Sequence, residues 1–247
     1  MYAIIPMTDQ YKWNLYWQGW ILSAFAFGYI TSQIIGASAA SKFGGKTVMT
    51  CAVFLWSFST VITPFVASSL SALLACRVFL GLGEGLGLPT IFHIFAHSVP
   101  VDERSRAFGY LVAAGTFGQT VAALVCPHIP WPWMFFSFGG LGAVWVLLWL
   151  VLYTEVRSFG QEELPMVFPK VTNINVRWTE FISHWPLWAI YVSHFAMNWS
   201  NYIIMQWLPT YLARSLGANK EDISLTAVPY VINSLFNVGR LTFRLFL

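Results

Sequence analysis

The most informative stretch of the chain is "CRVFLGLGEGLGLPTIF", Cys76 to Phe92. It is apolar almost throughout, yet it contains one cation, Arg77, and one anion, Glu84. A charged side chain at the centre of a bilayer costs about 2.5–3.5 kcal/mol on scales derived from membrane insertion. Side chains kept at that cost usually face a bundle interior or a water-filled cavity and have a function. The stretch therefore indicates a membrane helix with a functional interior face.

The composition of the whole chain agrees with a membrane protein. Hydrophobic residues make up 57% of it and charged residues only 9%, against about 25% charged residues in a typical soluble domain. Long uncharged runs separate the charges, and a crossing needs roughly 20 apolar residues. The run from Arg106 to Glu155 holds two crossings, because "CPHIPWPW" at its centre contains prolines that a helix interior does not tolerate. The sequence predicts an all-α polytopic membrane protein with seven crossings, at about 18–40, 47–70, 71–97, 107–126, 132–153, 186–212 and 223–245.

One long polar segment divides these crossings into two groups. Residues 1–153 are predicted to form a helix bundle, 154–185 a cytosolic linker, and 186–247 the start of a second bundle. Lysine and arginine gather in the loops on one side, which the positive-inside rule places in the cytosol. Residues on that side are Lys42, Lys46, Arg104, Arg106, Arg157, Lys170, Arg177, Arg240 and Arg244, and those on the other side are Lys12, Arg214 and Lys220.

Several other classes of protein do not fit the sequence. The three cysteines have no ligand-like spacing, so we expect neither a disulfide framework nor a metal site. A net charge of +3, spread over loops, gives no sign of a nucleic-acid partner. The predicted crossings contain no nucleophile with its base and no zinc-hydrolase motif, so we expect no enzyme, no catalytic residue and no cofactor.

The spacing of Arg77 and Glu84 suggests how they work. Seven residues turn a helix by about 700°, so both side chains point the same way, roughly 10 Å apart along the axis. In the functional interpretation, Arg77 neutralises an anionic substrate while Glu84 takes up a proton or organises a coupling sodium ion. The alternative is a structural network of ion pairs between helices. The glycine pairs Gly81/Gly85 and Gly83/Gly87 are interpreted as faces for close helix packing, since no strand precedes them as a dinucleotide-binding loop requires.

A second polar cluster follows the predicted linker. His194, Asn198 and Asn201 lie on one face of a helix, with Tyr202 beside them. These side chains are candidates for hydrogen bonds to an oxyanion from the second bundle. Interhelical hydrogen bonds, worth about 0.6 kcal/mol each in membrane bundles, are the alternative.

The chain resembles a known family along most of its length. "AFGYITSQIIG", "KFGGK", "CRVFLGLGEGLGLP", "VPVDERSRAFG", "WMFFSFGGLGAVWVLLWL" and "NWSNYIIMQWLPTYL" resemble, in family order, the anion:cation symporter branch of the major facilitator superfamily. Plant-type organellar anion and phosphate transporters are the most similar members. The resemblance implies a carrier of twelve helices in two halves. This chain would run from the end of the first helix through the eighth, as a fragment with an incomplete first bundle and a truncated second one.

The resemblance also implies an activity. It implies transport of phosphate or a small organic anion by alternating access, coupled to protons or sodium, in an organellar membrane such as that of the plastid, vacuole or Golgi. The expected partners are a small anion and the lipid bilayer. Met197 and Leu22 stand where the glutamate transporters of the family have an arginine and a histidine, so their mechanism is not carried over whole. A single fixed cation suggests a smaller or differently coordinated anion.

Specific positions match functional positions of the family. Arg77 and Glu84 match the charged pair that the family uses in transport. The segment "ASAASKFGGK" resembles the loop between helices two and three, a conformational latch, and "DERSR" resembles a gating cluster of salt bridges. The latch and gate residues implied in this way are Ser41, Lys42, Gly44, Gly45, Lys46, Glu103, Arg104 and Arg106.

A second function stays open at this point. A truncated chain that no longer transports can associate with a full-length relative, or regulate it, through its exposed helix faces. The genomic sequence on both sides of the reading frame discriminates between the two functions, because the carrier hypothesis requires further apolar helices to be encoded there.

Overall fold

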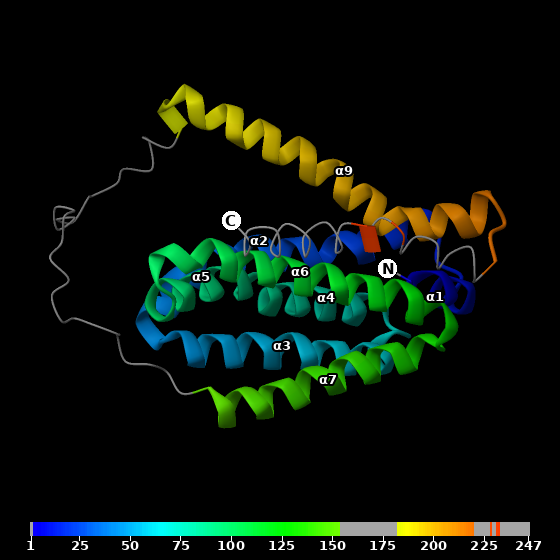
Figure 1. Ribbon diagram of the computed structural model, residues 1–247. Helices are drawn as coiled ribbons and strands as arrows, with labels where there is room; N and C mark the ends of the chain where they lie inside the picture. Colours follow the sequence, from blue (N-terminus) through cyan, green and yellow to red (C-terminus); the bar gives the residue numbers. More distant parts are fainter. Residues whose placement is uncertain (1, 154–181, 220–227, 229–230, 233–247) are drawn as a thin grey trace, which may run out of the picture.

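The computed structural model describes residues 2–153, 182–219, 228 and 231–232, and every element in these residues is helical (Figure 1). The all-α prediction is confirmed for this part of the chain. The elements are α1 (Ile4–Tyr11), α2 (Leu15–Phe43), α3 (Gly45–Val66), α4 (Leu70–Gly85), α5 (Gly87–Ser98), α6 (Val101–Val125), the 3-10 helix η1 (Cys126–His128), α7 (Trp131–Leu152) and α9 (Trp185–Ser215).

Five stretches are long and apolar enough to cross a membrane, and they confirm the first five predicted crossings. They are Leu15–Gly36, Gly45–Val66, Leu70–Ser98, Val101–His128 and Trp131–Leu152. The sixth predicted crossing is a helix, α9, whose 31 residues are long enough but fall short of the other five in hydropathy. Almost all of the seventh, 223–245, and almost all of the predicted linker lie outside the described residues.

Local sequence explains where the helices begin and end. The Asn14 side chain accepts a hydrogen bond from the Trp17 N–H at 3.0 Å and caps the start of α2. Gly44, with φ +84°, makes the turn between α2 and α3, a conformation that favours glycine. Two predictions need correction. Helix α1 was not predicted, although Pro6 is tolerated in its first turn, and α6 begins at Val101, so "DERSR" lies in a helix and not in a loop.

The predicted crossing at 71–97 is broken between α4 and α5. Leu86 separates the two helices, immediately after the turn that holds Glu84. Pro89 has no N–H to donate to the carbonyl of Gly85, four residues earlier, so the regular helical ladder is interrupted there. The break therefore follows from the sequence "GLGLP" and lies directly after the turn that holds Glu84.

Glycines of α4 pack directly against the backbones of two neighbouring helices. A Cβ added at Gly81 would collide with the Phe25 carbonyl of α2, and one added at Gly85 would collide with Ser32 of α2. A Cβ added at Gly83 would lie 2.8 Å from the Trp56 nitrogen of α3. Close packing through these glycines, predicted from their spacing, is confirmed.

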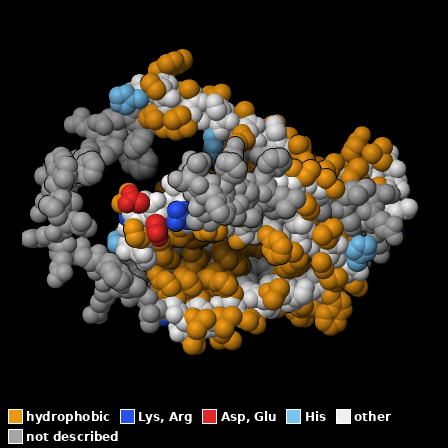
Figure 2. All heavy atoms as spheres, viewed as in Figure 1, with side chains coloured by type: hydrophobic (Ala, Val, Ile, Leu, Met, Phe, Trp, Pro, Cys, Tyr) orange, Lys and Arg blue, Asp and Glu red, His pale blue; other side chains and the backbone are white. Residues whose placement is uncertain are grey.

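Helix α6 stands apart from this tightly packed group. Its main contacts are with α5 and η1, near its two ends. A hollow lined by hydrophobic side chains opens on the face shown in Figure 2, and hydrophobic side chains cover much of the described surface around it. Exposed aromatic and aliphatic side chains of this kind suit helices that face lipid. The first candidate site residue, Arg77, lies beside the space next to α6.

Candidate functional site

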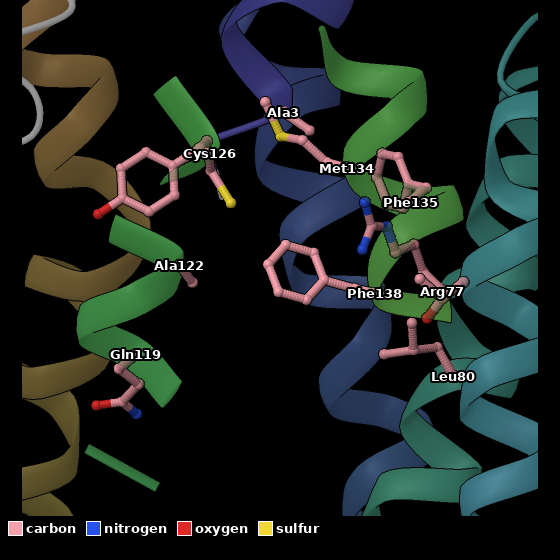
Figure 3. A pocket seen from close by; sticks show the side chains of 11 residues that line it. Ala3, Arg77, Leu80, Gln119, Ala122, Cys126, Met134, Phe135 and Phe138 are labelled. Atoms are coloured by element: carbon pink, nitrogen blue, oxygen red, sulfur yellow. The ribbon is translucent and has the colours of Figure 1, made fainter. Parts of the chain in front are cut away.

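Arg77 points from α4 into a cavity of about 340 Å³ (Figure 3). Gln119 and Ala122 of α6 lie on the opposite side of this cavity, and Phe135 and Phe138 of α7 lie on the same side as Arg77. The complete lining consists of Tyr2, Ala3, Thr60, Arg77, Leu80, Gln119, Ala122, Cys126, Met134, Phe135 and Phe138. Arg77 is the single cation in this largely apolar lining.

The Arg77 guanidinium has no acidic partner among the described residues. Its Nε is buried without a hydrogen bond, and the one ion pair in the described part of the chain joins Asp9 to Arg214. The guanidinium carbon lies 5.6 Å from the centroid of the Phe135 ring, a cation–π contact. The structural alternative, a network of ion pairs between helices, thus has no counterpart for Arg77 within residues 2–153 and 182–219. A buried cation in this state is costly, and its planar donors can bind an oxyanion bidentately.

Glu84 does not line the Arg77 cavity. It lies in the last turn of α4, directly before the break, and its side chain is exposed. The Tyr29 hydroxyl of α2 lies within electrostatic range of Glu84 and also of Tyr202 in α9. Arg77 and Glu84 were expected to line one functional stripe of the helix, but they do not share a cavity. Seven residues of helix separate the two side chains along the axis.

A second cavity, of about 710 Å³, lies between α2 and α9. Three of the four polar residues predicted in α9 line it, namely His194, Asn198 and Tyr202, whereas Asn201 is exposed and outside it. Its wall also contains Tyr29 and Gln33 of α2, which the sequence analysis did not single out. Gln33 donates from Nε2 to the Tyr29 hydroxyl at 3.2 Å.

Two of the cations predicted in the latch and the gate donate hydrogen bonds to backbone carbonyls at helix ends. Lys46 donates from Nζ to the Leu150 carbonyl of α7 at 3.1 Å. Arg104 donates from Nη2 to the Ala96 carbonyl of α5 at 2.7 Å and from Nε to the Val99 carbonyl at 3.1 Å. Carbonyls at the end of a helix have no partner within it, so these cations stabilise the ends of α7 and α5.

The other latch and gate residues lie at the same end of the bundle. Ser41 and Lys42 belong to the last turn of α2 and not to a loop. The Lys42 Nζ lies 5.5 Å from the centroid of the Phe43 ring. Gly45 is buried, and a Cβ added there would lie 2.6 Å from the Ile94 side chain. Glu103 and Arg106 are exposed. Since the described residues of "DERSR" form no ion pair, the predicted cluster of salt bridges is not present in this conformation.

Comparison with known proteins places this architecture in a family. The family model described as Major Facilitator Superfamily matches residues 1–246. The chain belongs to the Major Facilitator Superfamily. A D-xylose-proton symporter shares the fold, with a TM-score of 0.68 over 96% of this chain and 63% of that one, at 17% sequence identity. Membership and the apolar helices together make the chain a multi-pass membrane protein.

Relatives within the superfamily carry the names of anion carriers. The chain is 36% identical over 253 residues to a chloroplastic ascorbate transporter of Arabidopsis thaliana, covering 96% of this chain and 47% of that protein. It is 35% identical over 243 residues to the chloroplastic sodium-dependent phosphate transport protein 1 of Arabidopsis thaliana (92% and 47%), and 31% identical over 237 residues to sialin of Homo sapiens (90% and 48%). The chain thus spans about half the length of these relatives, and the two plant relatives are transporters by name.

Proposed function

We propose that this chain belongs to a secondary carrier that moves small anions across a membrane by alternating access. The observation behind the proposal is Arg77, a cation that faces a cavity within the membrane-spanning bundle and has no acidic partner in the described residues. An anion in that cavity would relieve the cost of the unpaired charge. Gln119 and Thr60, in the same lining, are polar neighbours for such an anion.

The substrate is proposed to be inorganic phosphate or a small organic anion. The names of the relatives support this range, since they include a phosphate and an ascorbate transporter. His194, Asn198 and Tyr202 would contribute hydrogen bonds from the second half of the carrier, and Asn201 would need a rearrangement of α9 to join them. The chloroplastic relatives favour an organellar membrane.

Coupling is assigned to Glu84. A carboxylate near the Tyr29 hydroxyl can accept a proton or help bind a sodium ion while Arg77 holds the anion. The separation of the two charges supports distinct tasks, because Glu84 does not line the Arg77 cavity. No further cofactor is required by this scheme.

Transport by the reconstituted protein tests the proposal. The protein encoded by the full gene is placed in proteoliposomes, and uptake of labelled phosphate, ascorbate, sialic acid and glutamate is measured with and without pH and sodium gradients. We expect gradient-dependent uptake of at least one anion, and its loss on Arg77→Ala. Absence of uptake for every anion, with correctly inserted protein, would refute carrier function and favour a non-transporting partner of a full-length relative.

A further inference from the structure

Burial along α9 is confined to its last turns. From Trp185 to Ile204 nearly all described side chains are exposed, whereas Trp207 is half-buried and Pro209 and Thr210 are buried. Figure 1 shows the same asymmetry, with the end of α9 beside α1 and its beginning away from α2. Among the described residues, α9 is therefore buried against the first group of helices mainly near its C-terminal end.

The contacts at that end join α9 to α1 and to the start of α2. Arg214 Nη2 lies 3.9 Å from Asp9 Oδ1, across the two halves of the chain. Trp207 packs over Gly19, where an added Cβ would lie 3.9 Å from its ring. The distribution of lysine and arginine places this end outside the cytosol.

The cavity between α2 and α9 begins directly below these contacts. Trp207 forms one end of its lining, and the lining continues to Gln33 and His194, toward the cytosolic end. A cavity with contacts between helices at one end, and with exposed α9 residues such as His194 at the other, resembles one state of an alternating-access cycle.

We propose that Asp9, Arg214 and Trp207 form the non-cytosolic gate of this carrier, closed in the structure described here. The inference rests on the proposed function and extends it to residues for which neither the sequence nor the comparisons suggested a role. An alternative is that the helix ends simply pack together and remain together throughout.

The energetics of the contact favour a gate over a permanent joint. The Arg214 side chain is 34% exposed and the Asp9 side chain 73% exposed, so the ion pair is weak and easily broken. The hydroxyls of Thr8 and Thr210, in α1 and α9, are buried without hydrogen-bond partners in the described residues. Opening the contact would give both hydroxyls access to water, which offsets part of the cost of separating the helices.

Accessibility of a cysteine inside the cavity tests the gate without requiring transport. Ser23, which lines the cavity on α2, is replaced by cysteine in a background in which the exposed Cys51 is changed to alanine. A membrane-impermeant maleimide is then applied to the full protein in sealed vesicles, from either side. We expect faster labelling from the cytosolic side, and Asp9→Asn and Arg214→Gln should each raise labelling from the other side by up to about five-fold, as the loss of an exposed ion pair allows.

Two further variants make the outcome decisive. The double variant that carries both Asp9→Arg and Arg214→Asp should restore slow labelling from the non-cytosolic side. In this variant the ion pair is re-formed with the two charges exchanged. Lys12→Asn, which removes an exposed charge from the same end without breaking a described ion pair, should leave labelling unchanged. Equal labelling in all variants, or an equal increase in Lys12→Asn, would overturn the gate. The labelling experiment tests only the gate, and the uptake assay tests the proposed anion transport independently.

Discussion

Arg77→Ala should abolish anion transport without lowering the stability of the protein. In most buried ion pairs, removal of one partner leaves the other charge stranded and costs about 3–5 kcal/mol. Arg77 has no acidic partner in the described residues, so its removal leaves none of their carboxylates buried without a counter-charge. The lost cation–π contact with Phe135 is worth about 0.5–2 kcal/mol, and relief of the buried charge offsets it. We expect an unchanged or raised unfolding temperature and no uptake.

Arg77→Lys refines the same prediction. Lysine keeps the positive charge but lacks the planar fork that binds an oxyanion bidentately. One hydrogen bond to a charged group is worth about 1.5–3 kcal/mol, and each 1.4 kcal/mol changes affinity tenfold. The apparent affinity for the anion should therefore fall by about 10- to 150-fold, while the maximal rate remains measurable in proteoliposomes.

Arg104→Ala is the matched control for stability. Arg104 donates to the carbonyls of Ala96 and Val99, so its loss leaves two acceptors at the end of α5 without a donor. Because Arg104 is half-buried and water can replace it in part, we expect a loss of about 1 kcal/mol. The reasoning is refuted if Arg77→Ala lowers the unfolding temperature as much as Arg104→Ala does, with transport reduced only in proportion to the amount of folded protein.

Three other predictions concern coupling and packing. Glu84→Gln should abolish gradient-driven accumulation in proteoliposomes while anion exchange persists, because the amide cannot take up a proton; retained accumulation would remove Glu84 from coupling. Tyr29→Phe removes the hydroxyl near Glu84 that accepts from Gln33, and we expect it to shift the pH dependence of uptake, whereas an unchanged pH profile would show that Tyr29 has no part in coupling. Gly81→Ala should greatly reduce folded protein, since its Cβ would collide with the backbone of α2, whereas Gly140→Ala, with nothing within 4 Å, should be tolerated; equal yields of the two variants by size-exclusion chromatography would contradict the packing described.

The fold was more predictable than the site. Apolar runs between charges located the crossings because the bilayer sets their length, and the glycine spacing identified the faces of α4 that contact α2 and α3. The short helix α1 was missed because eight residues do not register as a crossing. The start of α6 was misplaced because charged residues such as Arg104 and Arg106, in the first two turns of the helix, look like a loop in a search for apolar runs.

Side-chain partners were the part that sequence did not reveal. Periodicity indicates that Arg77 and Glu84 share a helix face, but the cavity that Arg77 enters depends on where α6 and α7 lie relative to α4. Lys46 was expected in a conformational latch and Arg104 in a cluster of salt bridges, and both donate to backbone carbonyls. Such carbonyls are present at every helix end, so the sequence does not show which of them a cation will reach. Tyr29 was recognisable only as a polar residue four positions before Gln33 in an apolar helix.

The direct contact between the backbones of α2 and α4 has a mechanical consequence. Gly28 and Gly81 each lie against the main chain of the opposite helix, so neither helix can slide or roll past the other without a collision. The backbone positions of Tyr29 and Glu84, one on each helix, are therefore fixed relative to each other, whereas Tyr202 belongs to α9. A proton or sodium ion held at Glu84 would have a constant environment on the side of Tyr29 and a changing one on the side of Tyr202. A displacement of α9 would then change the surroundings of that ion on the side of Tyr202.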